Sequence, residues 1–165
     1  MSKTRKVIGM GETIMDIIFR NGQPRAAVHG GSSFNSIVSV GRAGVPCVFV
    51  GDTDYCPMRP DMKSAVSLAY LDDNGDASYV FYKQKPEAPK EWTLPQIDAD
   101  DVLLYGSYFA SCQGMRPLVE DMLSHATAGG AIIYYDINFR SSHSHELEAL
   151  LPTIEDNCRR SSIVR

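Results

Sequence analysis

The stretch DVLLYGSYFASCQGMRPLVEDMLSHATAGGAIIYYDINFR, residues 101–140, decides the fold class. Within it, residues 102–105 and 131–135 are apolar and β-rich and predict two strands. Residues 115–128 predict a helix between these strands, which the glycine pair at 129–130 closes. A helix that joins two such strands is typical of a right-handed crossover between parallel strands. The stretch therefore predicts an α/β domain with a mostly parallel sheet.

The alternation of strands and helices continues on both sides of this stretch. Apolar, β-rich runs predict further strands at 6–10, 13–19, 26–28, 45–50 and 162–164. The run at 45–50 is entirely apolar, which is typical of a strand buried on both faces of a sheet. Helices are expected at about 32–43 and 145–157. We expect the hydroxyl of Ser32 or Ser33 to cap the first of them and Gly44 to end it.

One segment departs from this pattern. Residues 66–71 and 78–83 are β-rich and flank the sequence DDNGD at 72–76. Asn-Gly between two such runs is the strongest short-range hairpin signal, so an exposed antiparallel hairpin is expected here. The region 85–95 is rich in proline and charge, which predicts a loop anchored by Trp92.

The composition excludes several classes of function. The 165 residues carry a formal net charge of -4 and no basic stripe, so no nucleic-acid partner is expected. The longest apolar runs fall short of the roughly 18 residues that cross a bilayer, and residues 1–19 lack the features of a signal peptide. The four cysteines form no CxxC pair, which excludes a zinc or redox motif of that type. We therefore expect a cytoplasmic protein with no membrane partner.

The sequence GGSSFN at 30–35 is the first candidate for ligand binding. Ligands of open parallel sheets bind beyond the carboxyl ends of the strands, and this stretch is expected to lie there. Paired glycines let a small ligand approach the backbone, and Asn35 offers both donors and acceptors. The alternative is an ordinary glycine turn before a capped helix.

The sequence DINFR at 136–140 directly follows the expected strand AIIYY. It places the carboxylate of Asp136, the amide of Asn138 and the guanidinium of Arg140 at alternate positions beyond a strand end. Together they could bind hydroxyls and offset the charge of a phosphorylated group. The alternative is a loop in which Asp136 caps the following turn and Arg140 is solvated.

Asp16 is the third candidate, because it stands alone among apolar neighbours in TIMDIIF. A buried carboxylate is costly unless it is hydrogen-bonded, and sugar hydroxyls would suit it. The alternative is a position on the solvent face of an edge strand. Two other motifs are interpreted as non-functional. Gly9-Met10-Gly11 has Ile14 where a dinucleotide fingerprint needs its third glycine, and His143-Ser144-His145 is interpreted as a solvated helix cap.

Taken in order, these segments resemble the ribokinase-like, PfkB-type (phosphofructokinase B) carbohydrate kinases. Two motifs carry the resemblance: Gly-Gly-x-x-x-Asn at 30–35 and Asp-x-Asn-x-Arg at 136–140. The sequence looks most similar to members that phosphorylate fructose, 2-keto-3-deoxygluconate or related sugars. The resemblance implies a partial three-layer α/β/α core with a mostly parallel sheet and a small β lid, formed by about 13–28 and 65–83.

The resemblance also implies the roles of individual residues. A small-molecule sugar would be the ligand, ATP with Mg²⁺ would supply the phosphoryl group, and Asn138 and Arg140 would lie near the sugar and the transferred phosphate. The family's Gly-Ala-Gly-Asp signature, which supplies the catalytic base, does not occur in residues 1–165. We therefore expect these residues to form an incomplete domain, with the main ATP-binding and catalytic half absent and no catalytic residue of its own. The expected sugar-binding residues are Asp16, Gly30, Gly31, Asn35, Asn138 and Arg140.

The family pattern is interrupted after Gly51-Asp52, where only residues 53–63 replace a helix and further strands. Such a loss should uncover apolar surface, so we expect poor solubility or a homodimer through that surface. Three alternatives to a sugar kinase stay open at this point. They are a non-catalytic sugar-binding remnant or regulatory module, a nucleoside kinase, and a Rossmann-like nucleotide binder, which Ile14 and the hairpin disfavour.

Overall fold

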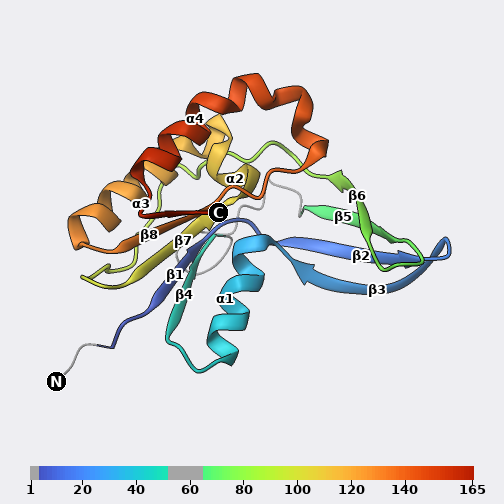
Figure 1. Ribbon diagram of the computed structural model, residues 1–165, viewed down its shortest axis with the longest axis horizontal. Helices are drawn as coiled ribbons and strands as arrows, with labels where there is room; N and C mark the ends of the chain where they lie inside the picture. Colours follow the sequence, from blue (N-terminus) through green and yellow to red (C-terminus); the bar gives the residue numbers. More distant parts are fainter. Residues whose placement is uncertain (1–3, 52–64) are drawn as a thin grey trace.

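A computed structural model describes residues 4–51 and 65–165, which form two β-sheets with flanking helices (Figure 1). The larger sheet has the strand order β4-β1-β7-β8-β9, and every neighbouring pair in it is parallel. Its strands are β1 (Val7–Met10), β4 (Cys47–Val50), β7 (Val102–Gly106), β8 (Ile132–Asp136) and β9 (Ile163–Val164). The predicted α/β fold with a mostly parallel sheet is confirmed.

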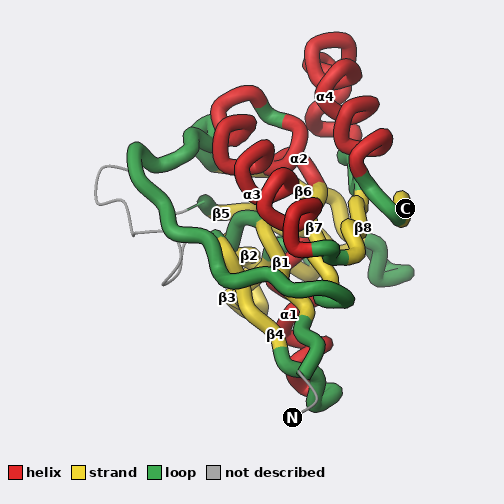
Figure 2. Tube along the Cα trace, turned by 90° about the vertical axis from the view of Figure 1, so that its left-hand side faces the viewer, coloured by secondary structure: helices red, strands yellow, loops and turns green. Residues whose placement is uncertain are grey.

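Helices cover both faces of this sheet (Figures 1 and 2). Helix α1 (Ser32–Arg42) lies on one face, beside β1 and β4. The other face carries α2 (Ser107–Ser111), α3 (Arg116–Gly129) and α4 (Leu147–Arg160), with the short 3-10 turns η1 (Gln113–Met115) and η2 (Ser141–Glu146). This is the expected three-layer arrangement. None of the described helices is long and apolar enough to span a membrane.

The main core lies between the sheet and helix α3. The helix presents a stripe of fully buried side chains at helical spacing, namely Leu118, Val119, Met122, Leu123 and Ala126. Alternate residues of the two central strands β7 and β8 face it, because successive side chains of a strand point to opposite sides. Burying each large apolar side chain contributes roughly 1.5–3 kcal/mol. Gly130, with φ of 76°, ends α3 as predicted.

The second sheet is a four-stranded lid with the order β3-β2-β5-β6, which extends to one side of the core (Figure 1). Strand β2 (Ile14–Arg20) pairs antiparallel with β3 (Gln23–Gly30) and parallel with β5 (Val66–Leu71). The predicted hairpin is confirmed, since β5 and β6 (Ala77–Tyr82) pair antiparallel and most residues of β6 are exposed.

Strand β3 is much longer than the expected residues 26–28. Asn21 and Gly22 both have positive φ, 52° and 70°, and form a tight turn between β2 and β3. Two consecutive left-handed residues match the right-handed twist of the paired strands. The turn therefore lets β3 pair along the full length of β2 despite its polar sequence.

Two local expectations are wrong. The strand expected at 45–50 to be buried on both faces is β4, which begins at Cys47, lies at the edge of its sheet and has only Val50 buried. The cap of α1 is Gly31, with no side-chain capping bond, and Ser33 is buried within the first turn. The short segment 53–63 that interrupts the family pattern lies outside the described residues.

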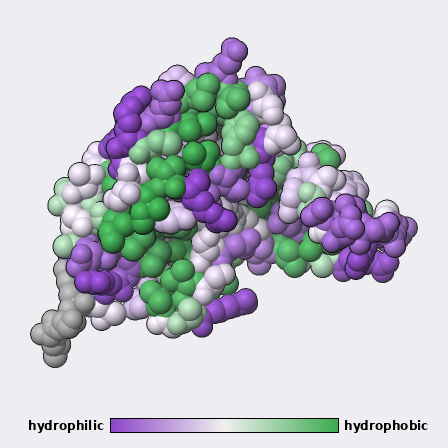
Figure 3. All heavy atoms as spheres, viewed as in Figure 1, coloured by the Kyte–Doolittle hydropathy of each residue, from purple (hydrophilic) through white to green (hydrophobic). Residues whose placement is uncertain are grey.

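Part of the sheet face on the side of α1 is left open. Ile132 of β8 is 39% exposed and Ile163 of the edge strand β9 is 47% exposed. Hydrophobic residues gather over this part of the molecule in Figure 3. The expected self-association through an apolar surface stays a prediction, and these residues are where it should occur.

Candidate ligand-binding site

The strand order of the large sheet marks where a ligand is expected. Along the chain, β1 is followed in this sheet by β4 on one side, whereas β7 lies on the other side of β1. The connections after β1 and β7 therefore lead away in opposite directions. In open parallel sheets ligands bind at such a reversal, beyond the carboxyl ends of the strands. The residues directly after these ends are Gly11 and Glu12 after β1, and Ser107 and Tyr108 after β7.

The predicted glycine pair packs against the chain itself. A Cβ atom on Gly30 would lie 2.0 Å from Oδ2 of Asp16, and one on Gly31 would lie 2.3 Å from the carbonyl oxygen of Glu12. Gly31 also has φ of 113°, a backbone angle that residues with a side chain rarely adopt. Both glycines are thus required by close approach, and they connect the lid strand β3 to helix α1.

Asp16 lies inside the lid sheet and not on an edge strand, so the alternative reading of its position is wrong. Its strand β2 has β3 on one side and β5 on the other. The hydroxyl of Ser67, which is fully buried on β5, donates a hydrogen bond to Oδ1 of Asp16. The second oxygen, Oδ2, faces Gly30. The carboxylate is therefore held in one orientation, and a lone serine in the apolar strand VSLAYL was the sequence signal for its partner.

Asn35 belongs to the first turn of α1, and its N–H donates to the carbonyl of Gly31 over 2.9 Å. Asn35 is exposed, and its side-chain amide has no hydrogen-bond partner among residues 4–51 and 65–165. The amide is therefore available to a ligand on the glycine side of the helix.

The carboxyl ends of β7 and β8 meet closely. A Cβ atom on Gly106 would lie 1.9 Å from the carbonyl oxygen of Asp136. Beyond these ends, Ser107 and Asn138 both have left-handed backbones, with φ of 57° and 37°. Nδ2 of Asn138 donates to Oγ of Ser107 over 2.8 Å. Two strained residues from adjacent strands are thus joined side chain to side chain.

The chain turns at Asn138, so the side chains of DINFR do not continue the extended alternation that the sequence suggested. Arg140 is exposed, and its carbonyl accepts a hydrogen bond from the N–H of His143 over 2.9 Å as η2 begins. The structure brings Asn138 into contact with the end of β7, whereas the guanidinium of Arg140 makes no hydrogen bond or ion pair within the described part of the chain.

A cluster that sequence reasoning missed joins the lid to the strand ends. Lys83, directly after β6, lies 2.6 Å from Oε1 of Glu12, and the lysine side chain is only 11% exposed. Its Nζ also lies 5.1 Å from the centre of the Tyr108 ring. The Tyr108 ring stacks on His143 with centroids 3.9 Å apart, and its hydroxyl donates to Glu146 over 3.1 Å.

Burial and neighbouring charges shift the titration of this cluster. Burial, then the bonded carboxylate of Glu146, raises the pKa of Tyr108 to about 12. Burial, then the charge of Lys83, lowers the pKa of His143 below its usual value, although Glu146 opposes this. The expected solvated histidine cap is wrong for His143, whose side chain is 15% exposed. His145 is solvated, at 73% exposed, but the N-cap of α4 is Glu146.

These contacts run without a break from the lid to the ends of β7 and β8. Asp16 touches Gly30, Gly31 touches Glu12, Glu12 binds Lys83, Lys83 covers Tyr108, and the neighbouring Ser107 binds Asn138. Among the described residues, no three histidine, cysteine or acidic side chains are grouped so that they could hold a metal ion. The arrangement offers fixed carboxylate and amide oxygens, which suit a polyhydroxylated ligand.

Solved structures with the same architecture include a fructokinase, an aminoimidazole riboside kinase and a PfkB protein. A fructokinase from Vibrio cholerae O395, in its apo form, matches with a TM-score of 0.79 at 18% identity, over 98% of this chain and 63% of its own. An aminoimidazole riboside kinase from Salmonella enterica, in complex with aminoimidazole riboside and an ATP analogue, matches with a TM-score of 0.74 at 19% identity, over 97% of this chain and 59% of its own.

A PfkB protein from Polaromonas sp. JS666 matches with a TM-score of 0.74 at 14% identity, over 98% of this chain and 65% of its own. The chain thus spans about 60% of the length of these structures. Comparisons with protein-family models and with curated proteins found no match. At these identities the likeness shows the fold, which is the ribokinase-like fold expected from the sequence.

Proposed function

We propose that residues 1–165 form the sugar-binding part of a ribokinase-like, PfkB-type carbohydrate kinase. The observation that carries the proposal is the carboxylate of Asp16. It lies inside the lid sheet, is oriented by Ser67 and packs on Gly30. A carboxylate held in this way can accept hydrogen bonds from two neighbouring hydroxyls of a sugar.

The proposed ligand is fructose, 2-keto-3-deoxygluconate or a related sugar. One of the matching fructokinase structures from Vibrio cholerae O395 contains fructose, ADP and a calcium ion. In the present chain, Asp16 and the exposed amide of Asn35 would bind sugar hydroxyls, and Gly30 and Gly31 would let Asp16 and the loop after β1 pack closely beside the sugar. Asn138 and Arg140 would lie toward the phosphate that is transferred.

Within this proposal the described residues bind and orient the sugar, and they carry no catalytic base. Phosphoryl transfer from ATP depends on positioning and on electrostatic stabilisation of the transferred group. The Gly-Ala-Gly-Asp signature that would supply a base and backbone donors does not occur in these 165 residues. ATP would donate the phosphoryl group in the complete reaction and Mg²⁺ would accompany the ATP, and we assign no ligand for either to this chain.

A nucleoside kinase is the second candidate, because one matching structure is an aminoimidazole riboside kinase. A sugar-binding module without phosphotransfer is the third. The same pocket residues would bind a free sugar or the ribose of a nucleoside, so the ligand must be identified by binding.

The test is isothermal titration of the 165-residue chain with D-fructose, 2-keto-3-deoxygluconate, adenosine and NAD. We expect binding of one of the two sugars, and a loss of affinity of at least about tenfold on Asp16→Asn, because one charged hydrogen bond is worth about 1.5–3 kcal/mol. Asp73→Asn is the matched control, since this lid carboxylate is exposed at the hairpin turn. Binding of adenosine alone would favour the nucleoside kinase, and binding of NAD alone would overturn the proposal.

A further inference from the structure

Ser107 has a backbone conformation that its side chain disfavours. Its φ of 57° lies in the left-handed region, where any residue with a Cβ atom is strained and glycine is not. Asparagine tolerates this region better than other residues do, so Asn138 at φ of 37° is less unusual. Serine at position 107 therefore destabilises the folded state through backbone strain, and glycine would relieve this strain.

The local structure gives no other reason for a serine here. The cap of α2 is Gly106, and it makes no side-chain capping bond. The carbonyl of Ser107 accepts a bond from Ser111 over 3.4 Å, which any residue at 107 could do. Within the part of the chain that the structure describes, Asn138 is the only hydrogen-bond partner of the Ser107 hydroxyl.

That bond fixes the direction of an amide assigned to the ligand. Because Nδ2 of Asn138 donates to Oγ of Ser107, its Oδ1 is directed away from the serine. Ser107 itself lies at the carboxyl end of β7, next to the strand reversal between β1 and β7. Strained residues that the surrounding structure holds in place are concentrated at functional sites.

We propose that Ser107 is a positioning residue for the sugar site, whose hydroxyl orients the Asn138 amide toward the ligand. This inference rests on the proposed function and adds to it a residue outside the motifs of the sequence. It makes a specific prediction, because strain and binding should respond in opposite directions to one substitution. A residue with only a structural role would change both in the same direction.

The experiment measures melting temperature and sugar affinity on the full chain, with D-fructose and 2-keto-3-deoxygluconate as probes. Ser107→Gly should raise the melting temperature by about 2–4 °C, because it removes the left-handed strain of a side chain. The same variant should weaken sugar binding about five- to tenfold, because the amide loses its fixed orientation. Ser107→Ala should weaken binding equally and leave the melting temperature without that rise.

A double-mutant cycle with Asn138→Ala tests whether Ser107 acts through the amide. In the Asn138→Ala background, Ser107→Ala should cause no further loss of affinity. Additive losses would overturn the inference, and so would unchanged affinity of both Ser107 variants while Asp16→Asn still loses binding. If the unmodified chain binds neither sugar, the proposed function fails first and this inference falls with it.

Discussion

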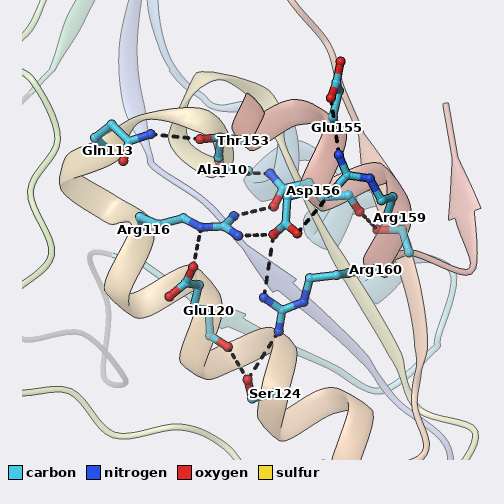
Figure 4. A network of polar contacts seen from close by, with 12 residues as sticks. Ala110, Gln113, Arg116, Glu120, Ser124, Thr153, Glu155, Asp156, Arg159 and Arg160 are labelled. Carbon is cyan, nitrogen blue, oxygen red and sulfur yellow. Dashed lines mark hydrogen bonds and ion pairs between the residues drawn. The ribbon is translucent and has the colours of Figure 1, made fainter. Parts of the chain in front are cut away.

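Two polar clusters of the molecule differ in how completely they are paired. Between α3 and α4, Arg116 donates to Glu120, Asp156 and Asn157, and the network continues to Arg160 and Ser124 (Figure 4). Asn157 is fully buried and donates in turn to the carbonyl of Ala110 over 3.0 Å. The backbone around this network is regular helix.

The cluster at the strand ends is different in both respects. Ser107 and Asn138 have left-handed backbones, and the side chains of Asn35 and Arg140 are exposed without hydrogen-bond partners among the residues described. The two strained residues, Ser107 and Asn138, are bonded to each other, whereas the exposed amide of Asn35 and the exposed guanidinium of Arg140 are available to a ligand. The number of polar contacts alone therefore does not locate the site, and the left-handed backbone at the ends of β7 and β8 is what distinguishes the second cluster from the first.

The largest expected effect is the loss of stability on breaking the α3–α4 network. Arg116→Met should lower the free energy of unfolding by about 2–3 kcal/mol, because the fully buried Asn157 loses the donor to its Oδ1, whereas Asp156 keeps Arg159 and Arg160. Urea unfolding measures this change. Sugar affinity of the folded variant should equal that of the unmodified chain.

The control for this prediction is Arg159→Met. Arg159 is 67% exposed and pairs with Glu155 on the surface, so its loss should cost less than about 0.5 kcal/mol. A loss of sugar binding in folded Arg116→Met would contradict the division between a structural network and a binding cluster.

An intermediate effect is expected for Lys83. It lies at the strand ends, over the Tyr108 ring, and like the residues of the α3–α4 network it has an ion-pair partner, Glu12. Lys83→Met should cost about 1–2 kcal/mol, because the remaining carboxylate of Glu12 is largely buried and loses its partner. It should also weaken sugar binding, since the pair connects the end of the lid to the loop after β1. Denaturation and titration of the same sample measure the two losses.

Lys85→Met is the matched control, because Lys85 is 81% exposed and its bond to Glu146 is at the surface. The double variant Lys83→Met with Glu12→Gln should be no less stable than Lys83→Met alone, because Glu12→Gln removes the carboxylate that Lys83→Met leaves unpaired. If both lysine variants behave alike, the lid is not fixed through Lys83.

Sequence reasoning predicted the parts of this fold that local pattern determines. The two central strands, helix α3 with its end at Gly130, and the hairpin β5–β6 follow from periodicity and from single glycine signals. It failed where a local turn signal was overlooked, as before β3, or where the position of a strand in the sheet could not be deduced from its apolar sequence, as for β4. Asn21-Gly22 carries the same turn signal as the hairpin, yet the polar sequence after it hid strand β3.

The sequence singles out candidate site residues where they lie in continuous motifs or stand as an isolated charge. The glycine pair and Asn138 are candidates of the first kind, and Asp16 is a candidate of the second. Glu12 and Lys83 are 71 residues apart, and Ser107 and Asn138 are 31 apart, so no local pattern pairs them. The strain at Ser107 likewise depends on how β7 and β8 end together, which only the folded chain shows.

The smallest expected effect concerns His143, whose pKa is lowered by burial and by Lys83 more than Glu146 and Glu12 raise it. Since the unfolded chain then binds more protons below the ordinary histidine pKa of about 6.5, stability should fall as pH decreases through that value. His143→Phe keeps a ring against Tyr108 and cannot be protonated, so its stability should fall less between pH 7.5 and 5.5. His145→Phe, at a histidine that is 73% exposed, should retain the full pH dependence. Urea unfolding at both pH values measures the change in the free energy of unfolding. An equal change for all three proteins would contradict the prediction, because it would show that protonation of His143, stacked on Tyr108, does not affect stability.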